Sequence, residues 1–464
     1  MTSLPPYPRT KPINIPWIGE VPEHWLVSRF KYWYDTGMGA TILGEDLEDE
    51  GTIPVFSATE SSKVFGYVNQ ATVPLSTGDL VIPARGNSIG SVMMVEEILA
   101  TSTQTTIYAQ LKDVRHVHGK YAFYFQSGLR KYLFGFDNTA IPQLTVDQVR
   151  NNTFLLPPLP EQTHIARYLD HKTALIDAFL ARKWRMIALL KERRQALISH
   201  AVTKGLDPSA PMKDSGIEWI GVVPAHWEVS KVKHLCKVFG RIGFRGYAKE
   251  DLVQAGEGAL VIGGKHIGDD ELKLTDPDYL SWEKYYESPE IMIAKGDIVV
   301  SQRGTLGKVA VIDRELGPAT INPSMILLKE LECDSAFFGY FFKSAYFKSF
   351  IDLVNTSTAV PMISQEQLGN VTVSLPPRDE QLLLVEVLNE RTTLIDDEII
   401  RIQTSMERVR EYRQALISAV VTGKVDVRGV EVPEADQMIS GSDDQMMEYE
   451  EGTEELSVAA EPED

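Results

Sequence analysis

The amino-acid sequence predicts an α+β protein built by tandem duplication, with two mixed α/β domains joined by two long helices that form an antiparallel coiled coil. Two observations support this prediction. Segment 15–33 resembles segment 217–235, 202 residues further on, and segment 193–207 resembles segment 412–426, 219 residues further on. Neither proline nor glycine occurs in 161–201 or in 380–421, and each of these stretches is long enough for about 60 Å of helix.

The parts between the repeated ends differ between the two copies and have the pattern of β-strands. Apolar runs separated by glycine-rich turns predict strands in 52–59, 63–68, 78–86 and 105–111, and again in 258–264, 296–304, 308–313 and 324–331. The aromatic segments 121–136 and 336–354 predict short helices. Similar ends with dissimilar middles are expected of two copies that share a scaffold and bind different targets. An old duplication that drifted is the alternative, although it would spread the differences more evenly.

These boundaries define five segments. They are a first mixed domain at 1–157, a first helix at 158–207, a second mixed domain at 208–374, a second helix at 375–428 and a tail at 429–464. The tail contains 13 acidic and no basic residues, and we expect it to be disordered.

A heptad pattern in both long helices predicts that they pair with each other. Lys183, Arg194 and Arg413 interrupt the apolar seam. The alternative is that each helix packs only on its own copy. The apolar seam positions are Leu169, Ile176, Leu180, Ile187, Leu190 and Leu197 in the first helix, and Leu388, Ile395, Ile399, Ile402, Val409 and Leu416 in the second.

Charge and cysteine content restrict the class of protein. The net charge is −19, of which the tail supplies −13, so the remaining chain is only weakly acidic. This balance argues against a protein that coats nucleic acid without specificity, but it permits a reader with local basic loops. No apolar run is long enough for a membrane span, and the two cysteines, Cys236 and Cys333, cannot form a disulfide framework. We therefore expect a soluble protein of the reducing cytoplasm.

The sequence contains no recognisable catalytic motif. A phosphate-binding loop, a zinc-binding H-E-x-x-H helix, a cysteine–histidine cluster and a G-x-S-x-G elbow are all missing. His24 and His226 recur in the duplicated P-x-H-W motif, but beside tryptophan they favour a core or capping role over a catalytic one. We expect no enzyme activity, no metal and no cofactor in this chain.

The best binding candidates are two arginines, Arg85 and Arg303, each of which precedes glycine in a turn after an apolar strand. Glycine permits close approach of the backbone, and the neighbouring polar side chains suit phosphates or base edges. The alternative is a structural turn in which each arginine pairs with the preceding Asp79 or Asp297. The full set of candidate DNA-binding residues is Arg85, Asn87, Ser88, Gln104, Arg241, Arg245, Lys265, Arg303, Thr305 and Lys308.

The repeated motifs resemble those of a known family, the specificity subunits of type I restriction–modification systems. The resemblance rests on WIGEVPEHW at 17–25, the arginine–glycine turn, TAIPQLT at 139–145, LPPLPEQ at 156–162 and RRQALIS at 193–199, each with a second copy, and it extends over 15–428. The second copy departs from the pattern with LPPRDEQ at 375–381, and the acidic tail lies outside it.

This resemblance implies two target recognition domains, each of which reads one half of a bipartite, asymmetric DNA target. It implies that the paired helices set the gap between the half-sites and dock two methyltransferase subunits, and that motor-nuclease subunits join the complex. S-adenosylmethionine, ATP and magnesium are then expected on the partner subunits, in the cytoplasm of a prokaryote, with no membrane involved.

Two other functions remain open from the sequence. A stand-alone, site-specific DNA-binding or regulatory protein could use the same fold without partners. A fused methyltransferase would need a cofactor loop and an N/D-P-P-[YF] motif, to which Asn322-Pro323-Ser324 is the nearest approach.

Overall fold

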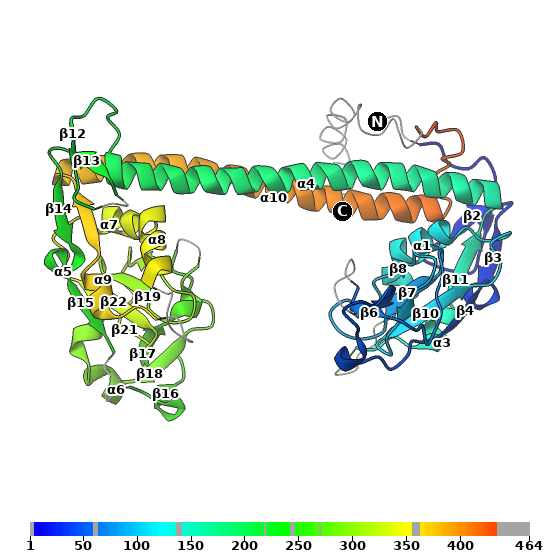
Figure 1. The fold of residues 1–464 in the computed structure, drawn as a ribbon, viewed down its shortest axis with the longest axis horizontal. Helices are drawn as coiled ribbons and strands as arrows, with labels where there is room; N and C mark the ends of the chain where they lie inside the picture. Colours follow the sequence, from blue (N-terminus) through cyan, green and yellow to red (C-terminus); the bar gives the residue numbers. More distant parts are fainter. Residues whose placement is uncertain are drawn as a thin grey trace. The chain divides into compact units, whose positions relative to one another are not determined.

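The computed structural model describes residues 4–58, 64–135, 142–217, 220–241, 246–268, 271–354 and 362–433. It divides into two compact units, Met1–Trp184 with Gln403–Asp464, and Arg185–Ile402. Each unit contains one β-rich domain together with one end of each long helix (Figure 1). The predicted tail at 429–464 lies outside the described residues from 434 onward.

The β-rich domain of the first unit is built on a four-stranded antiparallel sheet with the strand order β4-β10-β7-β8. A smaller sheet has the strand order β6-β5-β9. A further pair of strands, β3 and β11, lies next to the start of the first long helix. The elements are β1 (Thr10–Pro12), β2 (Glu20–Pro22), β3 (Leu26–Arg29), β4 (Tyr34–Met38), β5 (Ile53–Phe56), β6 (Gly66–Val68), β7 (Leu80–Pro83), β8 (Met93–Met94), β9 (Thr101–Ser102), β10 (Thr106–Leu111), α1 (Gly119–Gly128), α2 (Arg130–Leu133), α3 (Val146–Arg150) and β11 (Thr153–Leu156).

The second unit repeats this plan with a sheet of order β15-β22-β19-β20 and a second sheet of order β16-β18-β17-β21. β14 pairs with β23 as β3 does with β11. The elements are β12 (Met212–Asp214), β13 (Val222–Pro224), β14 (Glu228–Lys231), α5 (Val232–Leu235), β15 (Lys237–Gly240), β16 (Leu252–Val253), β17 (Gly258–Ile262), β18 (Asp278–Ser281), α6 (Trp282–Tyr286), β19 (Ile298–Ser301), β20 (Val309–Val311), β21 (Ala319–Ile321), β22 (Met325–Lys329), α7 (Ser335–Phe342), α8 (Ala345–Val354), α9 (Gln365–Gly369) and β23 (Thr372–Leu375).

The core of each unit consists of aromatic and branched residues from the sheet and from the aromatic helices. Trp25 in the first unit and Trp227 in the second are fully buried. The predicted aromatic helices are present, because α1 buries Tyr121 and Phe125 and α7 buries Phe337 among other rings. The two cysteines are free and buried, and burial raises the pKa of both thiols to about 12.

The two long helices are α4 (Leu159–Lys204) and α10 (Arg378–Val421). Their extent confirms the prediction from the missing prolines and glycines. Gly205 and Gly423 follow them with a φ of +73° each, a conformation that glycine adopts without steric cost and that ends a helix. Among the described residues, no helix is both long enough and apolar enough to cross a membrane.

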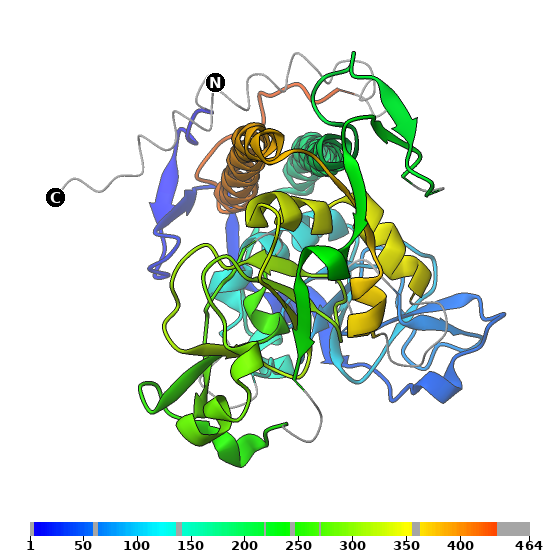
Figure 2. The same ribbon diagram turned by 90° about the vertical axis from the view of Figure 1, so that its left-hand side faces the viewer.

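The helices pair in an antiparallel manner within each unit, and Figure 2 shows them nearly end-on, side by side. In the first unit, Leu175, Ile176 and Phe179 of α4 form a buried cluster with Val409 of α10. Ion pairs join Arg413 Nε to Asp177 Oδ1 at 3.2 Å in the first unit, and Arg194 Nε to Asp396 Oδ1 at 3.0 Å in the second. Carboxylates of the partner helix thus neutralise two of the charges that interrupt the seam.

The apolar seam residues of the long helices also contact the domains. Leu169 and Leu416 belong to the core of the first unit and Leu388 belongs to that of the second, so the helices pack on the domains as well as on each other. Buried positions are Leu169, Ile176, Ile187, Leu388, Ile399, Ile402, Val409 and Leu416, and half-buried positions are Leu180, Leu190, Leu197 and Ile395.

Candidate nucleic-acid interface

The first long helix begins with a glutamate that holds the repeated histidine–tryptophan pair. Glu161 Oε1 accepts hydrogen bonds from Trp25 Nε1 at 3.0 Å and from Tyr7 Oη at 2.7 Å, and Glu161 Oε2 accepts one from His24 Nε2 at 2.7 Å. Burial and the hydrogen bond to Glu161 raise the pKa of Tyr7 far above its usual value, so the phenol stays protonated as a donor. The first turn of α4 is thereby attached to the N-terminal strands.

The second copy repeats this arrangement at the start of α10. Glu380 accepts hydrogen bonds from Trp227 Nε1 at 3.1 Å and from His226 Nε2 at 2.7 Å. Both histidines therefore help to attach a long helix to its domain. The substitution of LPPRDEQ for LPPLPEQ leaves this contact in place.

The glutamine that follows each glutamate ties the helix to its domain. Gln162 accepts a hydrogen bond from His118 N at 2.9 Å, next to the start of α1. Gln381 accepts one from Asp334 N at 2.8 Å, next to the start of α7. The sequence showed that the EQ motif is duplicated but not that its two residues attach the helix to the domain. The repetition of the motif was the one signal of this role in the sequence.

The repeated segment before β11 and β23 positions the arginine turns. Leu144 N donates to Ala84 O at 3.0 Å, beside Arg85, and Ile363 N donates to Gln302 O at 3.1 Å, beside Arg303. In each copy a capping box then begins a short helix, with Thr145 before α3 and Ser364 before α9. The two copies therefore present their arginine turns on equivalent supports.

In the first unit the candidate residues gather around the turn after β7. Arg85, Asn87 and Gln104 are exposed. Ser88 Oγ donates to Ala58 O at 3.0 Å, which uses the hydroxyl to hold the turn. Gln104 Oε1 accepts from Thr41 Oγ1 at 3.1 Å. The surface combines one cation with amide groups, which suits contacts to base edges and phosphates.

The alternative in which each arginine pairs with a preceding aspartate does not match the contacts of the described residues. Asp79 accepts hydrogen bonds from Ser76 N and Leu111 N. Asp297 accepts one from Ala294 N and lies 3.6 Å from Lys329 Nζ. Burial raises the pKa of both aspartates. Both carboxylates thus stabilise the start of a strand, and both arginines stay exposed.

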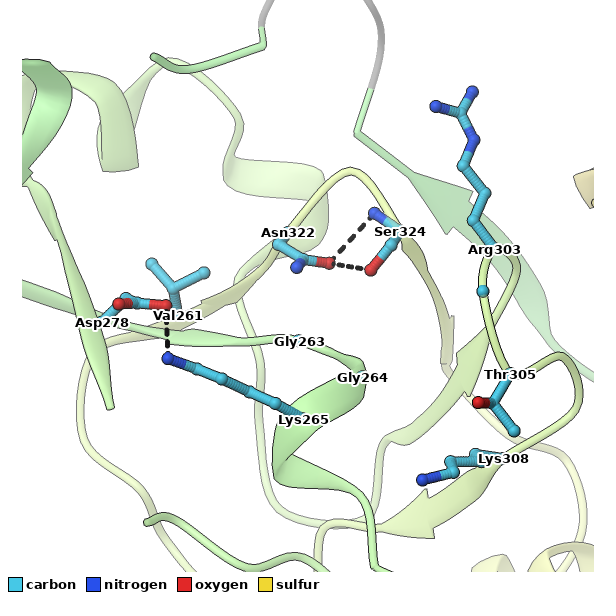
Figure 3. A pocket seen from close by; sticks show the side chains of 11 residues that line it. Val261, Gly263, Gly264, Lys265, Asp278, Arg303, Thr305, Lys308, Asn322 and Ser324 are labelled. Atoms are coloured by element: carbon cyan, nitrogen blue, oxygen red, sulfur yellow. Dashed lines mark hydrogen bonds and ion pairs between the residues drawn. The ribbon is translucent and has the colours of Figure 1, made fainter. Parts of the chain in front are cut away.

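In the second unit the candidates line a pocket of about 390 Å³, shown in Figure 3. Lys265, Thr305 and Lys308 lie around it, and Arg303 extends from its rim. Lys265 Nζ is 3.0 Å from Asp278 Oδ2, and Lys308 Nζ donates to Ile267 O at 3.2 Å. Three cations and one carboxylate make this pocket suited to an anionic or polar ligand such as nucleic acid.

Two further lining residues, Asn322 and Ser324, were missed from the sequence as site residues. Asn322 Oδ1 accepts hydrogen bonds from Ser324 N at 3.0 Å and Ser324 Oγ at 2.7 Å, which fixes the orientation of the amide. A Cβ atom at Gly263 would lie 2.5 Å from Asn322 Nδ2, so any side chain at this position would force the Asn322 amide to move. No local pattern marks Asn322, because its neighbours in the pocket come from distant strands.

The expectation for Arg241 is wrong. Its side chain is buried, with Arg241 Nε donating to Ile321 O at 3.2 Å and Nη2 donating to Thr320 Oγ1 at 3.0 Å. The guanidinium also stacks on Tyr247. These contacts make Arg241 part of the domain interior instead of a DNA-contacting residue. Arg245 lies outside the described residues.

The described part of the chain contains no cluster of three or more metal-ligating side chains. The duplicated scaffold carries two turns in equivalent positions, each with an exposed arginine, Arg85 in the first unit and Arg303 in the second.

Comparison with known proteins identifies the family. The family model described as "Type I restriction modification DNA specificity domain" matches residues 22–181 and 224–403. The chain is 24% identical over 428 residues to the type I restriction enzyme MjaVIII specificity subunit of Methanocaldococcus jannaschii, which covers 88% of this chain and 95% of that protein. It is 22% identical over 316 residues to the EcoBI specificity subunit of Escherichia coli, 65% of each chain.

A solved chain from work on complex assembly and conformational transition of the type I R-M system has a similar fold. The TM-score is 0.65 at 14% identity, and the alignment covers 87% of this chain and 99% of that chain. With the family model matching two copies over most of the chain, the protein belongs to the family of type I restriction–modification DNA specificity subunits.

Proposed function

We propose that each domain of this specificity subunit reads one half of a bipartite, asymmetric DNA target through the major groove. The observation that supports this most directly is the pair of arginine turns, which occupy equivalent supports but have different surroundings. Arg85 is exposed in a turn that also contains Asn87, whereas Arg303 lies at the rim of a pocket that Lys265 and Lys308 also line. Two unlike reading surfaces on one repeated scaffold suit two unlike half-sites.

The long helices set the gap between the half-sites and dock two methyltransferase subunits. Both helices expose large apolar side chains that the described domains do not cover, namely Trp184 and Leu189 on α4 and Leu394 and Ile400 on α10. Apolar side chains that join into one exposed patch mark protein-binding faces, so these positions are the candidates for the docking surface.

The chemistry resides on the partners in this proposal. This chain aims the complex, methyltransferase subunits supply S-adenosylmethionine-dependent methylation, and motor-nuclease subunits supply ATP- and magnesium-dependent translocation and cleavage. The complex works in the cytoplasm of a prokaryote.

The decisive experiment is methylation mapping after a domain exchange. Residues 34–138 are replaced by the matching segment of another family member, and genomic methylation is compared with that of cells carrying the original chain. We expect one half-site to change while the other half-site and the gap stay the same. Changes in both half-sites would contradict the proposal.

A stand-alone DNA-binding protein of the same fold makes a different prediction. That protein would bind its site tightly as a purified chain. The specificity subunit should bind poorly alone and should form a complex with two methyltransferase chains per copy, as measured by size-exclusion chromatography with light scattering.

A further inference from the structure

In the second unit, a second hollow lies next to the pocket that Lys265, Arg303 and Lys308 line, which we call the recognition pocket. It has a volume of about 350 Å³ and extends from the turn after β19 to the corner between α7 and α8 and to one face of α4. Thr305 and Lys308 line both hollows, so the two lie next to each other. We call the second hollow the basic groove, defined by Arg194, Lys308, Lys343, Lys348 and Asp352.

The basic groove has a fixed shape, because the corner that forms one wall is bound to α4. Gln195 Nε2 donates to Lys343 O at 2.8 Å, and Ala345 N donates to Ser199 Oγ at 2.8 Å. Phe342 and Phe347 are buried beneath the corner. Lys343, which directly follows α7, and Lys348 of α8 therefore extend from a backbone that is held against α4.

The side chains that line the groove carry a net positive charge. Four cationic side chains line it against one carboxylate, Asp352, although Arg194 also pairs with Asp396. Lys348 is exposed and Lys343 half-buried. Cationic side chains dominate the charged groups of this surface, and such side chains suit contacts to phosphate groups.

The equivalent corner in the first unit has different chemistry. Gln414 Nε2 donates to Gly128 O at 2.5 Å, as Gln195 does to Lys343 O. A glycine thus stands where the second unit has Lys343. Arg130, two residues further on, donates to Ile89 O in the recognition turn itself. The lysine-rich corner is therefore a feature of the second unit.

We infer that the basic groove binds the phosphodiester backbone of duplex DNA adjoining the half-site that the second domain reads. The inference rests on the proposed DNA-reading function and adds a contact that is independent of base sequence. Because Thr305 and Lys308 line both the basic groove and the recognition pocket, this backbone contact would lie next to the bases that are read.

The test uses the complex of this chain with its methyltransferase subunits and two duplexes, one with the mapped target and one of random sequence. The variant is K343Q/K348Q, and affinity is measured by fluorescence anisotropy over a series of salt concentrations. Each lost phosphate contact should reduce the slope of log affinity against log salt by about 0.9. We expect weaker binding to both duplexes with an unchanged preference for the target.

Two matched variants sharpen the test. Lys295→Gln removes an exposed lysine at the opposite end of β19 from Arg303, and it should leave affinity and slope unchanged. Asp352→Asn removes the carboxylate from the groove and should tighten binding to both duplexes.

The outcomes separate the inference from the proposed function. If the original complex binds no duplex, the proposed function fails. If it binds but K343Q/K348Q retains the original affinity and slope, the basic groove has no role in DNA binding. Reduced retention of methyltransferase subunits with unchanged DNA affinity would also overturn the inference, because the groove would then be a protein-docking surface.

Discussion

The two copies attach their long helices in similar ways but with different numbers of contacts. The side chain of Glu161 is 7% exposed and binds Tyr7 as well as the histidine–tryptophan pair, whereas that of Glu380 is 28% exposed and binds only the pair among the described residues. Tyr7 belongs to the N-terminal segment, which also meets the segment after α10, since Asp426 N donates to Pro5 O at 2.7 Å.

The difference follows from chain connectivity. In the second unit, the chain runs directly from α4 through 205–211 into β12. This covalent link holds the strands β12 and β13 near the start of α10. In the first unit, the segment around Tyr7 and the segment after α10 are far apart in the sequence, and Arg428 stacks on the Tyr7 ring at 4.8 Å. Polar and aromatic contacts join these two segments.

The largest expected effect tests this comparison directly. Glu161→Ala leaves the buried Tyr7 and Trp25 donors without an acceptor and should lower the free energy of unfolding by about 3–5 kcal/mol. Glu380→Ala, in a more exposed site with a continuous chain, should cost about 1–2 kcal/mol. Urea unfolding of the two variants measures both values. Equal losses would show that connectivity is irrelevant.

The arginine turns should affect DNA recognition with little effect on stability. Arg85→Ala and Arg303→Ala each remove one base or phosphate contact, which should reduce site-specific methylation by roughly 10- to 100-fold, or about 1–3 kcal/mol. The melting temperature should stay unchanged. Arg241→Ala provides the control, because removal of a buried, hydrogen-bonded guanidinium should lower the melting temperature. A large stability loss for the exposed arginines would favour a structural role.

The turn at the end of α1, at Gly128, and the turn after α7, at Lys343, should differ in how much a substitution lowers the free energy of unfolding. A Cβ atom at Gly128 would lie 2.4 Å from Ile417 Cγ2, and Ile417 is buried. Gly128→Ala should therefore destabilise the first unit by about 1–2 kcal/mol through overpacking. Lys343→Ala at the equivalent corner should change stability by less than about 0.5 kcal/mol. Thermal unfolding measures both, and a neutral Gly128→Ala would contradict the packing argument.

The smallest effects are expected at the two ion pairs between the helices. Arg413→Ala and Arg194→Ala should each cost less than about 1 kcal/mol, because solvent screens partly exposed pairs. The cost should be larger for Arg194, whose side chain is 15% exposed against 35% for Arg413. Double-mutant cycles with Asp396→Ala and Asp177→Ala isolate each pair. A larger coupling energy for Arg413 would reverse this order.

Much of the fold could be predicted because it depends on neighbours along the chain. The missing prolines and glycines predicted α4 and α10 to within a few residues at their starts and ends. The apolar run before Arg85 predicted β7, and the run before Arg303 predicted β19. The antiparallel pairing followed from the heptads and the duplication together.

The duplication, the extent of the two long helices and the position of each arginine at the end of a strand could be predicted from the sequence alone, because periodicity and turn chemistry are local properties. Other features became visible only in the tertiary structure. Arg241 is buried, and Asn322 lines the same pocket as Lys265 and Lys308. Asp177 and Asp396 form ion pairs with the arginines of the helix seam. Burial and pairing depend on groups that lie far apart in the sequence, so the same residue types receive different roles according to what folds against them.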